Sequence, residues 1–459
     1  MTETQQHRND ALQLFFVLFA VSAFFTHIGV STNDGVRYSL AKAIATRGTL
    51  SVDGVLTRVI PAEIAVDSAT FEGRLYSDKA PVGSFVGVVP AFIGHHLTSH
   101  EPARIWLTSC VMSALPFAAI GALLFLAARR EGLETIGALR IAGALTLGTN
   151  LLYWSTLMFS HALTAYLVCQ CVYLLRYARN KPRGDMVAGI CAGLAVGNDY
   201  YMIIWLPVLA VYVFHLDRRR LPLVVVGAAL AGTIPAMYHA AVFGNPFVLP
   251  HRYHTSYATF HGQGVYGVGW FRPKAFWDLL LGTGYGLLFF NPVLLLWAFL
   301  GREKLLRSRV LFAFGIGLTG VLIGLVGSVE HPSYGLSLSW GPRYLCPVIP
   351  VLALAILPAV DEAFMSRRAV RLIIGLSAAL NGSLLLVYFL PGPFEGIRFL
   401  LGRGVEVILS TGGLSVPGQL KALHGIPIPA LLVFLANAAV LVFPWGLWGW
   451  QKHQRERVG

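Results

Sequence analysis

Residues 11–38 read ALQLFFVLFAVSAFFTHIGVSTNDGVRY, a largely apolar run that passes without a break into a polar segment. The apolar part, 11–30, has the length of about 20 residues that a helix needs to cross a bilayer. It is longer than the apolar core of a signal peptide, only Arg8 precedes it as a basic residue, and no A-x-A cleavage site follows. We therefore expect a retained membrane span that delivers residues 31–38 to the membrane surface.

The composition extends this interpretation to the whole chain. Of the 459 residues 56% are hydrophobic and 12% are charged, and the mean hydropathy is +0.64, whereas soluble domains carry about 25% charged residues. These values exclude a soluble enzyme, a disulfide scaffold and a disordered chain. The sequence predicts an all-α polytopic membrane protein, 1–459 as one integral membrane domain, with about 12 transmembrane helices at the apolar runs 11–30, 103–128, 136–152, 160–176, 186–198, 202–216, 221–243, 276–299, 309–328, 343–360, 369–391 and 428–450.

The basic residues decide the orientation. If run 82–97 is an interfacial or re-entrant helix, clusters such as Arg218–Arg220 all fall on one side, as the positive-inside rule requires of the cytoplasm. Both termini are then cytoplasmic, and the loops 31–102, 244–275 and 392–427 are extracytoplasmic. The formal charge of +13 has the same origin, so we expect the lipid bilayer and no nucleic acid as partner.

The first polar constellation directly follows the first span. Asp34, Arg37, Tyr38 and Lys42 recur at helical spacing, and Thr32 or Asn33 is placed to cap an amphipathic helix in the outer interface. Asp34 is a candidate catalytic carboxylate; the alternative is that it only favours the helix N-terminus.

The second constellation precedes run 82–97. Asp78 and Lys79 stand at the mouth of that helix, and Pro81 suits its first turn. A lysine beside a helix N-terminus can hold a phosphate, because the helix end adds partial positive charge and N–H donors. The alternative is a lysine that snorkels to the interface.

A third group lies at the outer end of run 343–360, where Trp340, Arg343 and Tyr344 follow one another closely and Glu330 and His331 precede them. Arg343 can be an interface anchor or a bidentate phosphate ligand. The loop 244–275 carries a further polar group, His251, Arg252, His254 and His261. Two isolated polar residues lie at membrane depth: His161 at the outer start of run 160–176, and Asp199 in the break between the short runs 186–198 and 202–216.

Metal and disulfide chemistry are not expected. The histidines of the 244–275 loop have no neighbouring Cys or carboxylate to complete a zinc site, and phosphate or sugar hydroxyl contacts suit them better. The five cysteines, Cys110, Cys169, Cys171, Cys191 and Cys346, all stand in apolar stretches and are expected to be small core residues.

With these residues in place, the chain resembles the GT-C superfamily of membrane glycosyltransferases, and within it family 39, which includes protein O-mannosyltransferases and lipid A aminoarabinose transferases. The motifs are an acid after the first span (Asp34), a Lys-Pro-Pro-like segment (Lys79-Ala80-Pro81), the segment from Gly148 to His161, and the stretch Trp340–Tyr344. The chain departs from the family pattern where Gly35 follows Asp34, where Ala80 replaces a proline, and where Ser160-His161 replaces an acid.

The resemblance implies transfer of a sugar from a polyprenyl-phosphate donor to a lipid, polysaccharide or protein acceptor, at the extracytoplasmic face of a bacterial inner membrane. Catalysis would invert the anomeric carbon without metal or other cofactor, with Asp34 as base and the donor phosphate held by Lys79, Arg343, Arg252 and His251. Further substrate contacts are expected from Arg37, Tyr38, Asp78, His161, Asp199, His254, Glu330, His331 and Tyr344. The rival interpretation is a secondary transporter or flippase, but the polar groups crowd one surface and no internal repeat is visible.

Overall fold

The computed structural model describes residues 3–60, 66–178, 181–254, 256, 267–300, 308–331, 334, 336, 341–387 and 404–458, with the side chains of residues 3, 4 and 452–458 left out. Trp340, His261 and parts of the 244–275 and 392–427 loops lie outside these residues. All five cysteines are buried and free, as expected.

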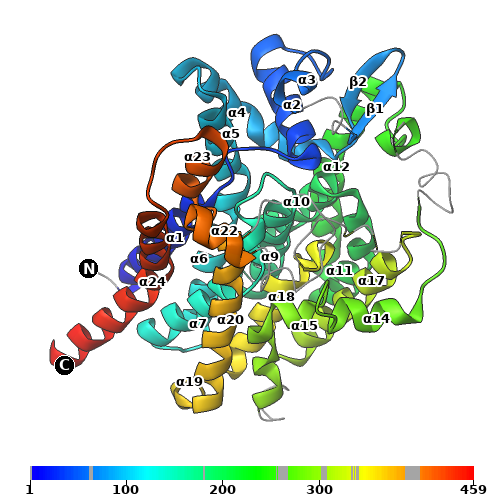
Figure 1. Cartoon of the computed structure of the whole chain (residues 1–459). Helices are drawn as coiled ribbons and strands as arrows, with labels where there is room; N and C mark the ends of the chain where they lie inside the picture. Colours follow the sequence, from blue (N-terminus) through cyan, green and yellow to red (C-terminus); the bar gives the residue numbers. More distant parts are fainter. Residues whose placement is uncertain are drawn as a thin grey trace.

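Helices account for nearly all of the regular structure, which confirms the predicted all-α, multi-span class (Figure 1). In the described part of the chain, six helical segments are long and apolar enough to cross a membrane: Gln5–Phe25, Glu101–Arg130, Tyr200–Phe243, Arg309–Gly327, Arg368–Val387 and Ala430–Gln451. They correspond to α1 (Glu3–Phe25), α5 to α6 (Glu101–Ser109, then the π-helix η2, Cys110–Ala114, and Leu115–Arg130), η3 to α12 (η3, Tyr200–Ile204; α11, Trp205–Asp217; η4, Arg218–Arg220; α12, Leu221–Phe243), α17 (Arg309–Gly327), α20 (Arg368–Val387) and α24 (Ala430–Val458). The total of 12 crossings stays a prediction.

Shorter helices fill the space between these spans. They are α7 (Thr135–Leu147), α8 (Leu151–Trp154), α9 (His161–Tyr177), α10 (Pro182–Asn198), η5 (Pro250–Tyr253), η7 (Arg343–Leu345), α18 (Val348–Ile356), η8 (Leu357–Ala359), α19 (Glu362–Ser366), α22 (Val405–Thr411) and α23 (Val416–His424).

One predicted span is broken. The run 276–299 forms three short helices, α14 (Pro273–Leu280), α15 (Leu287–Phe290) and η6 (Pro292–Phe299). Glycines at 282, 284 and 286 and a proline at 292 interrupt the run, and both residue types disfavour a continuous helix. Hydropathy identified an apolar segment here but could not show that its helix is interrupted.

Helices α10 and α12 pack at very close range through glycines. A side-chain carbon on Gly189 would lie 2.1 Å from the carbonyl oxygen of Val224, and one on Gly193 would lie 2.3 Å from that of Ala228. Small residues let two membrane helices approach until their backbones touch. This contact fixes the end of α10, where the polar residues Asn198 and Asp199 stand.

A layer of short elements covers one end of the helix bundle (Figure 1). It consists of α2 (Thr32–Arg47), α3 (Leu56–Val59), the antiparallel strands β1 (Ser68–Phe71) and β2 (Arg74–Ser77), and α4 (Pro81–Leu97). The predicted helices at 31–42 and 82–97 are therefore present, and Pro81 is the first residue of α4. The hairpin was not predicted; its turn places Glu72 and Gly73 at positive φ, as a two-residue hairpin turn requires.

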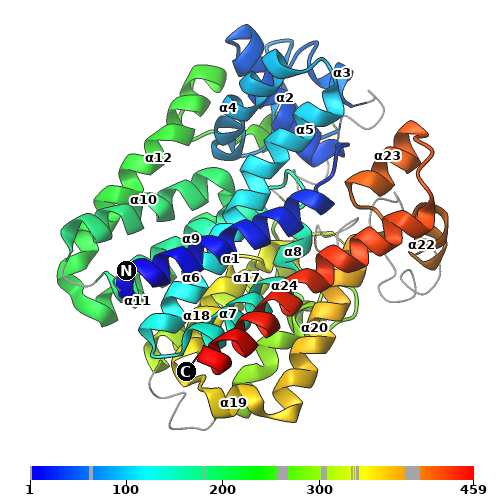
Figure 2. The same ribbon diagram turned by 90° about the vertical axis from the view of Figure 1, so that its left-hand side faces the viewer.

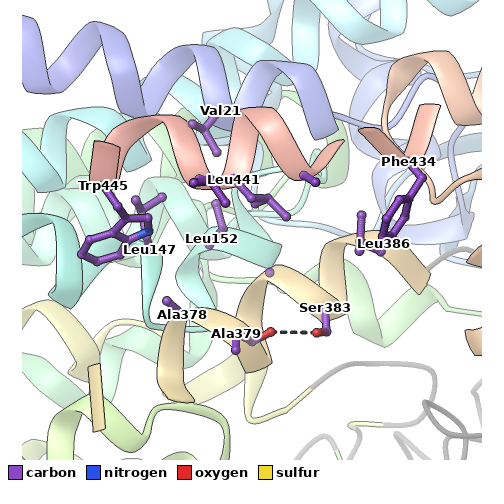
Figure 3. A pocket seen from close by; sticks show the side chains of 13 residues that line it. Val21, Leu147, Leu152, Ala378, Ala379, Ser383, Leu386, Phe434, Leu441 and Trp445 are labelled. Carbon is purple, nitrogen blue, oxygen red and sulfur yellow. Dashed lines mark hydrogen bonds between the residues drawn. The ribbon is translucent and has the colours of Figure 1, made fainter. Parts of the chain in front are cut away.

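An apolar pocket of about 320 Å³ opens between α1, α20 and α24 (Figure 3). Val21, Leu386, Leu441 and Trp445 are among the residues that line it. From its position among three spanning helices we expect hydrocarbon from the bilayer to fill it. Apart from this pocket, α4 leaves Val86, Val89, Phe92, Ile93 and Leu97 exposed.

Candidate functional site

A buried carboxylate, Asp199, lies where the layer meets the bundle. Helix α10 ends at Asn198, and Asp199 has an extended backbone (φ −145°, ψ 108°) before η3 begins. Its side chain accepts hydrogen bonds from Ser160 Oγ (2.5 Å) and Thr164 Oγ1 (2.7 Å), both at the start of α9. His161 Nδ1, also on α9, lies 3.8 Å from Asp199 Oδ2. The break in the helix thus aims an acid at the N-terminal turn of α9.

Arg37 connects this carboxylate to the covering layer. Its Nη2 lies 3.8 Å from Asp199 Oδ1, and only 4% of the Arg37 side chain is exposed. Arg37 also donates to Asn33 Oδ1 (3.2 Å) and to the carbonyl oxygen of Ala80 (3.4 Å), the residue that precedes α4. A buried ion pair with additional hydrogen bonds holds its guanidinium in one place.

The neighbouring asparagine was missed by sequence reasoning. Asn198 Nδ2 donates to the carbonyl oxygen of Ser160 (2.9 Å) and to Thr164 Oγ1 (2.8 Å). A side-chain carbon on Gly83 would lie 2.7 Å from Asn198 Oδ1, so the first turn of α4 rests directly on this amide. The signal in the sequence was the Asn-Asp pair in a break between apolar runs, but only the aspartate of this pair was predicted to be a site residue.

Lys79 lies in a second, adjacent group. Its Nζ is 2.8 Å from Asp78 Oδ2 and 3.4 Å from Asp67 Oδ1, and His254 Nε2 is 3.4 Å from Asp78 Oδ2. Burial opposes the charge of Lys79, but the two carboxylates raise its pKa above the ordinary value. Burial likewise opposes ionisation of Asp78, but Lys79 and the histidines bring its pKa well below the usual range. Lys79 is therefore a cation between two anions.

The same group offers ligands for a metal ion. Asp67, Asp78 and His254 place one ligand atom each within 4.8 Å of one another. Two carboxylates and an imidazole are a donor set that suits several divalent metals. The ammonium of Lys79 contacts both carboxylates and supplies positive charge there. The expectation of a metal-free site stays a prediction.

Asp34 stands on α2, one turn before Arg37. Its Oδ1 accepts from the backbone N–H (2.5 Å) and the hydroxyl (2.6 Å) of Ser31, so Ser31 is the N-terminal cap rather than Thr32 or Asn33. Thr32 instead accepts a hydrogen bond from the N–H of Asp67. Burial raises the pKa of Asp34 to about 6, against the effect of its bonds to Ser31. Asp34 combines a helix-terminal role with a pKa close to neutral.

Arg343 is part of an aromatic wall on the other side of His161. Its guanidinium lies over the rings of Tyr344 (4.9 Å) and Phe159 (6.0 Å), and Nη2 donates to the Tyr344 hydroxyl (3.1 Å). The Tyr344 ring in turn meets His161, with 5.8 Å between ring centroids. The structure thereby brings Arg343, Tyr344, His161, Asp199 and Arg37 together from four separate parts of the chain.

The loop histidine His251 lies near this assembly. Its ring is 6.0 Å from that of Tyr200, whose hydroxyl is 2.6 Å from His239 Nε2 on α12. Arg252, the next residue, is exposed. Tyr200 and His239 were not singled out in the sequence, because a tyrosine and a histidine inside apolar runs resemble ordinary interface residues.

Three predicted site residues have other surroundings. Tyr38 packs between α2, α4 and α5 with Ala91 and Ile105, beneath Lys42. Glu330 is exposed and its N–H donates to Gly267, while the carbonyl oxygen of His331 accepts from Arg272. Tyr38 therefore joins the layer to α5, and the other two belong to the contact between residues 267–272 and 328–331.

The comparison with solved structures agrees with this architecture. No protein-family model matches the chain, and no curated protein does. The chain is a multi-span membrane protein with a GT-C-like fold.

Two of the solved structures similar to this chain are of ArnT from Cupriavidus metallidurans. One, bound to undecaprenyl phosphate, has a TM-score of 0.55 at 16% identity, and the other, in the apo state, has 0.53 at 18%. Each match covers 97% of this chain and 76% of the ArnT chain. AglB from Archaeoglobus fulgidus, solved with an inhibitory peptide and a dolichol-phosphate, gives a TM-score of 0.44 at 12% identity. This match covers 94% of this chain and 56% of the AglB chain. At these identities the likeness establishes the fold alone.

Proposed function

We propose that the protein is a glycosyltransferase that takes a sugar from a polyprenyl-phosphate donor and transfers it to an acceptor at the extracytoplasmic membrane surface. The observation that carries this proposal is that two cations lie at the start of α4: Arg37 donates to the carbonyl oxygen of Ala80, and Lys79, paired with Asp78, directly precedes that residue. The fold is similar to that of an ArnT bound to undecaprenyl phosphate. Cations beside a helix N-terminus are suited to a phosphate.

The chemistry follows from these positions. An oxygen of the acceptor attacks C1 of the sugar from the face opposite the phosphate, the C1–O bond to phosphate breaks, and the phosphate keeps the electron pair. Lys79 and Arg343 offset the charge that develops on the leaving phosphate, with His251 and Arg252 as further contacts. The acceptor proton passes to the Asp34 carboxylate, whose pKa of about 6 suits a general base near neutral pH. One displacement inverts C1 and requires no metal.

The remaining residues take substrate-binding roles in this proposal. Asp199 holds Arg37, His161 and Tyr344 form a wall beside Arg343, and Asp78 and His254 position Lys79. The exposed apolar face of α4, with Val89, Phe92 and Leu97, begins beside Lys79 and offers a path for the polyprenyl chain. We place the protein in a bacterial inner membrane with 12 crossings and both termini in the cytoplasm.

Purified protein in nanodiscs tests the proposal with radiolabelled polyprenyl-phosphate sugars. We expect wild type to bind and turn over a donor, Asp34→Asn to bind without turnover, and Lys79→Ala to lose binding. Lys274→Ala is the matched control, because Lys274 is an exposed lysine paired with Asp278 outside the site. If folded wild type binds no such donor, the glycosyltransferase assignment fails and transport of a lipid-linked substrate becomes the function to assay.

A further inference from the structure

A second groove lies at the other end of the bundle, between α1 and α6. It has a volume of about 400 Å³, and its floor consists of apolar side chains, among them Leu12, Phe15 and Ala122. His7, Arg8, Arg129 and Arg130 form its rim. Both helices are long and apolar enough to cross the membrane, so the floor faces hydrocarbon and the rim belongs at headgroup level.

The groove is remote from the polar site. Residues 8 and 25 of α1 are separated by about 26 Å along the helix axis at about 1.5 Å per residue, and the candidate active site lies beyond the second of them. Figure 2 shows the N-terminal end of α1 at mid-height on the left, away from α2, α3 and α4 at the top of the view. No step of the proposed transfer uses this groove.

The rim is built to hold positive charge in place. Arg129 Nη2 is 2.6 Å from His7 Nε2, and Arg129 Nη1 donates to the carbonyl oxygen of Leu133. The guanidinium of Arg130 lies over the rings of Tyr173 (5.2 Å) and Tyr177 (5.6 Å) and donates to the Tyr177 carbonyl oxygen (3.2 Å). Arg8 and Arg130 are nevertheless exposed, so their remaining N–H groups are accessible to a ligand.

The C-terminal part of α24 also contacts α1. Gln451 of α24 donates to Gln13 of α1 (3.1 Å), and the sequence continues with Lys452, Arg455 and Arg457. A surface with this charge repels a second copy of itself and attracts an anion. The apolar floor distinguishes a lipid from a free anion, because a soluble phosphate would leave the floor uncovered.

We propose that this groove binds an anionic phospholipid of the bilayer, with its phosphate between Arg8 and Arg130 and an acyl chain along the apolar floor. Arginine forks bind phosphate oxygens in pairs, and basic pockets between spanning helices are suited to anionic headgroups. The ligand differs from the proposed donor in both chemistry and location, so this site can be present or absent independently of transferase activity.

Native mass spectrometry of the full chain, released from micelles that contain equal amounts of phosphatidylglycerol and phosphatidylcholine, tests the proposal. We expect wild type to retain phosphatidylglycerol preferentially. The double variant Arg8→Ala/Arg130→Ala should lower the affinity for phosphatidylglycerol by about 25-fold, since each basic residue near an anionic surface contributes about fivefold in affinity. Arg218→Ala/Arg219→Ala is the matched control, because it removes two exposed arginines from η4 and should change little.

A second variant tests the floor without changing any charge. Ala122→Trp fills the groove and should displace phosphatidylglycerol, whereas Ala229→Trp, at an exposed position of α12, should not. The variant Arg8→Lys/Arg130→Lys keeps both charges, so it should keep part of the preference for phosphatidylglycerol. It thereby separates a loss of charge from a loss of folding in the double-alanine variant. Equal retention of both lipids by wild type, equal losses in the two double-alanine variants, or full retention by Ala122→Trp would each overturn the proposal.

Discussion

Replacing Asp199 with asparagine tests whether the buried ion pair organises the candidate site. The amide keeps the size of the carboxylate and can still bond the hydroxyls of Ser160 and Thr164, so the change removes mainly the negative charge beside Arg37. At 3.8 Å and an effective dielectric constant of about 20, the lost attraction is about 4 kcal/mol. Removal of one partner from a buried pair typically costs about 3–5 kcal/mol.

The chain offers a matched control in a second buried pair, Arg220 and Asp185. Its Nη2–Oδ1 distance is 2.6 Å, and at most 9% of either side chain is exposed. We expect Asp185→Asn and Asp199→Asn to lower the unfolding free energy by comparable amounts, measured by denaturant titration in mixed micelles with tryptophan fluorescence. Only Asp199→Asn should also weaken donor binding, because Arg37 loses its fixed position. An Asp199→Asn protein with unfolding free energy within 1 kcal/mol of wild type and unchanged donor affinity would refute the reasoning.

Three further outcomes are expected. Burial raises the pKa of Asp34 from 3.8 to about 6, so its contribution to folding stability is complete below pH 3.8 and is lost as the pH rises through 6. A general base must be ionised, so kcat/KM should fall as the pH decreases through about 6. A kcat/KM profile that is flat from pH 5 to 8 contradicts the role of Asp34 as base. Chelation with EDTA should leave donor turnover unchanged, because Lys79 supplies the positive charge between the carboxylates; a loss that Mn²⁺ restores contradicts this. Gly189→Ala should cost more than about 3 kcal/mol in unfolding free energy because its new carbon overlaps the Val224 carbonyl oxygen, whereas Gly232→Ala, with open space around it, should change it by less than about 1 kcal/mol.

The spans were predictable because hydropathy is a local property. The apolar runs at 221–243 and 309–328 match α12 and α17 to within one residue, whereas α1 begins eight residues before the run 11–30 and ends five residues before it does. The match is close because a helix in hydrocarbon must satisfy its own backbone and needs a fixed length to do so. The run 276–299 shows the limit of this reasoning: a segment of equally apolar composition is broken into short helices, because its glycines and proline interrupt the helix.

The sequence singled out many residues that the structure brings together in the candidate site, but it did not predict their contacts. Sequence position placed Arg37, Lys79 and Arg343 on one membrane face, but it could not pair Arg37 with Asp199, because that contact depends on the glycine packing of α10 against α12. The hairpin between Asp67 and Asp78 carried a readable signal, a Glu-Gly turn between short strands, and it brings both carboxylates to one lysine.

In the proposed function, the charge balance of the candidate site determines how the donor phosphate can enter. A free lysine beside a helix end would attract a phosphate directly, whereas Lys79 already contacts two carboxylates and Arg37 already contacts Asp199. Three acids therefore offset two of the cations before any donor arrives, and a phosphate can reach Lys79 only if that lysine loosens its hold on Asp67 or Asp78. Arg343, which is held by aromatic rings and a phenol hydroxyl, and the N–H groups at the start of α4 then supply the attraction that draws a donor in. In this arrangement the acids act as positioning groups for Lys79, because they keep the ammonium in a buried location where an isolated charge would be unstable.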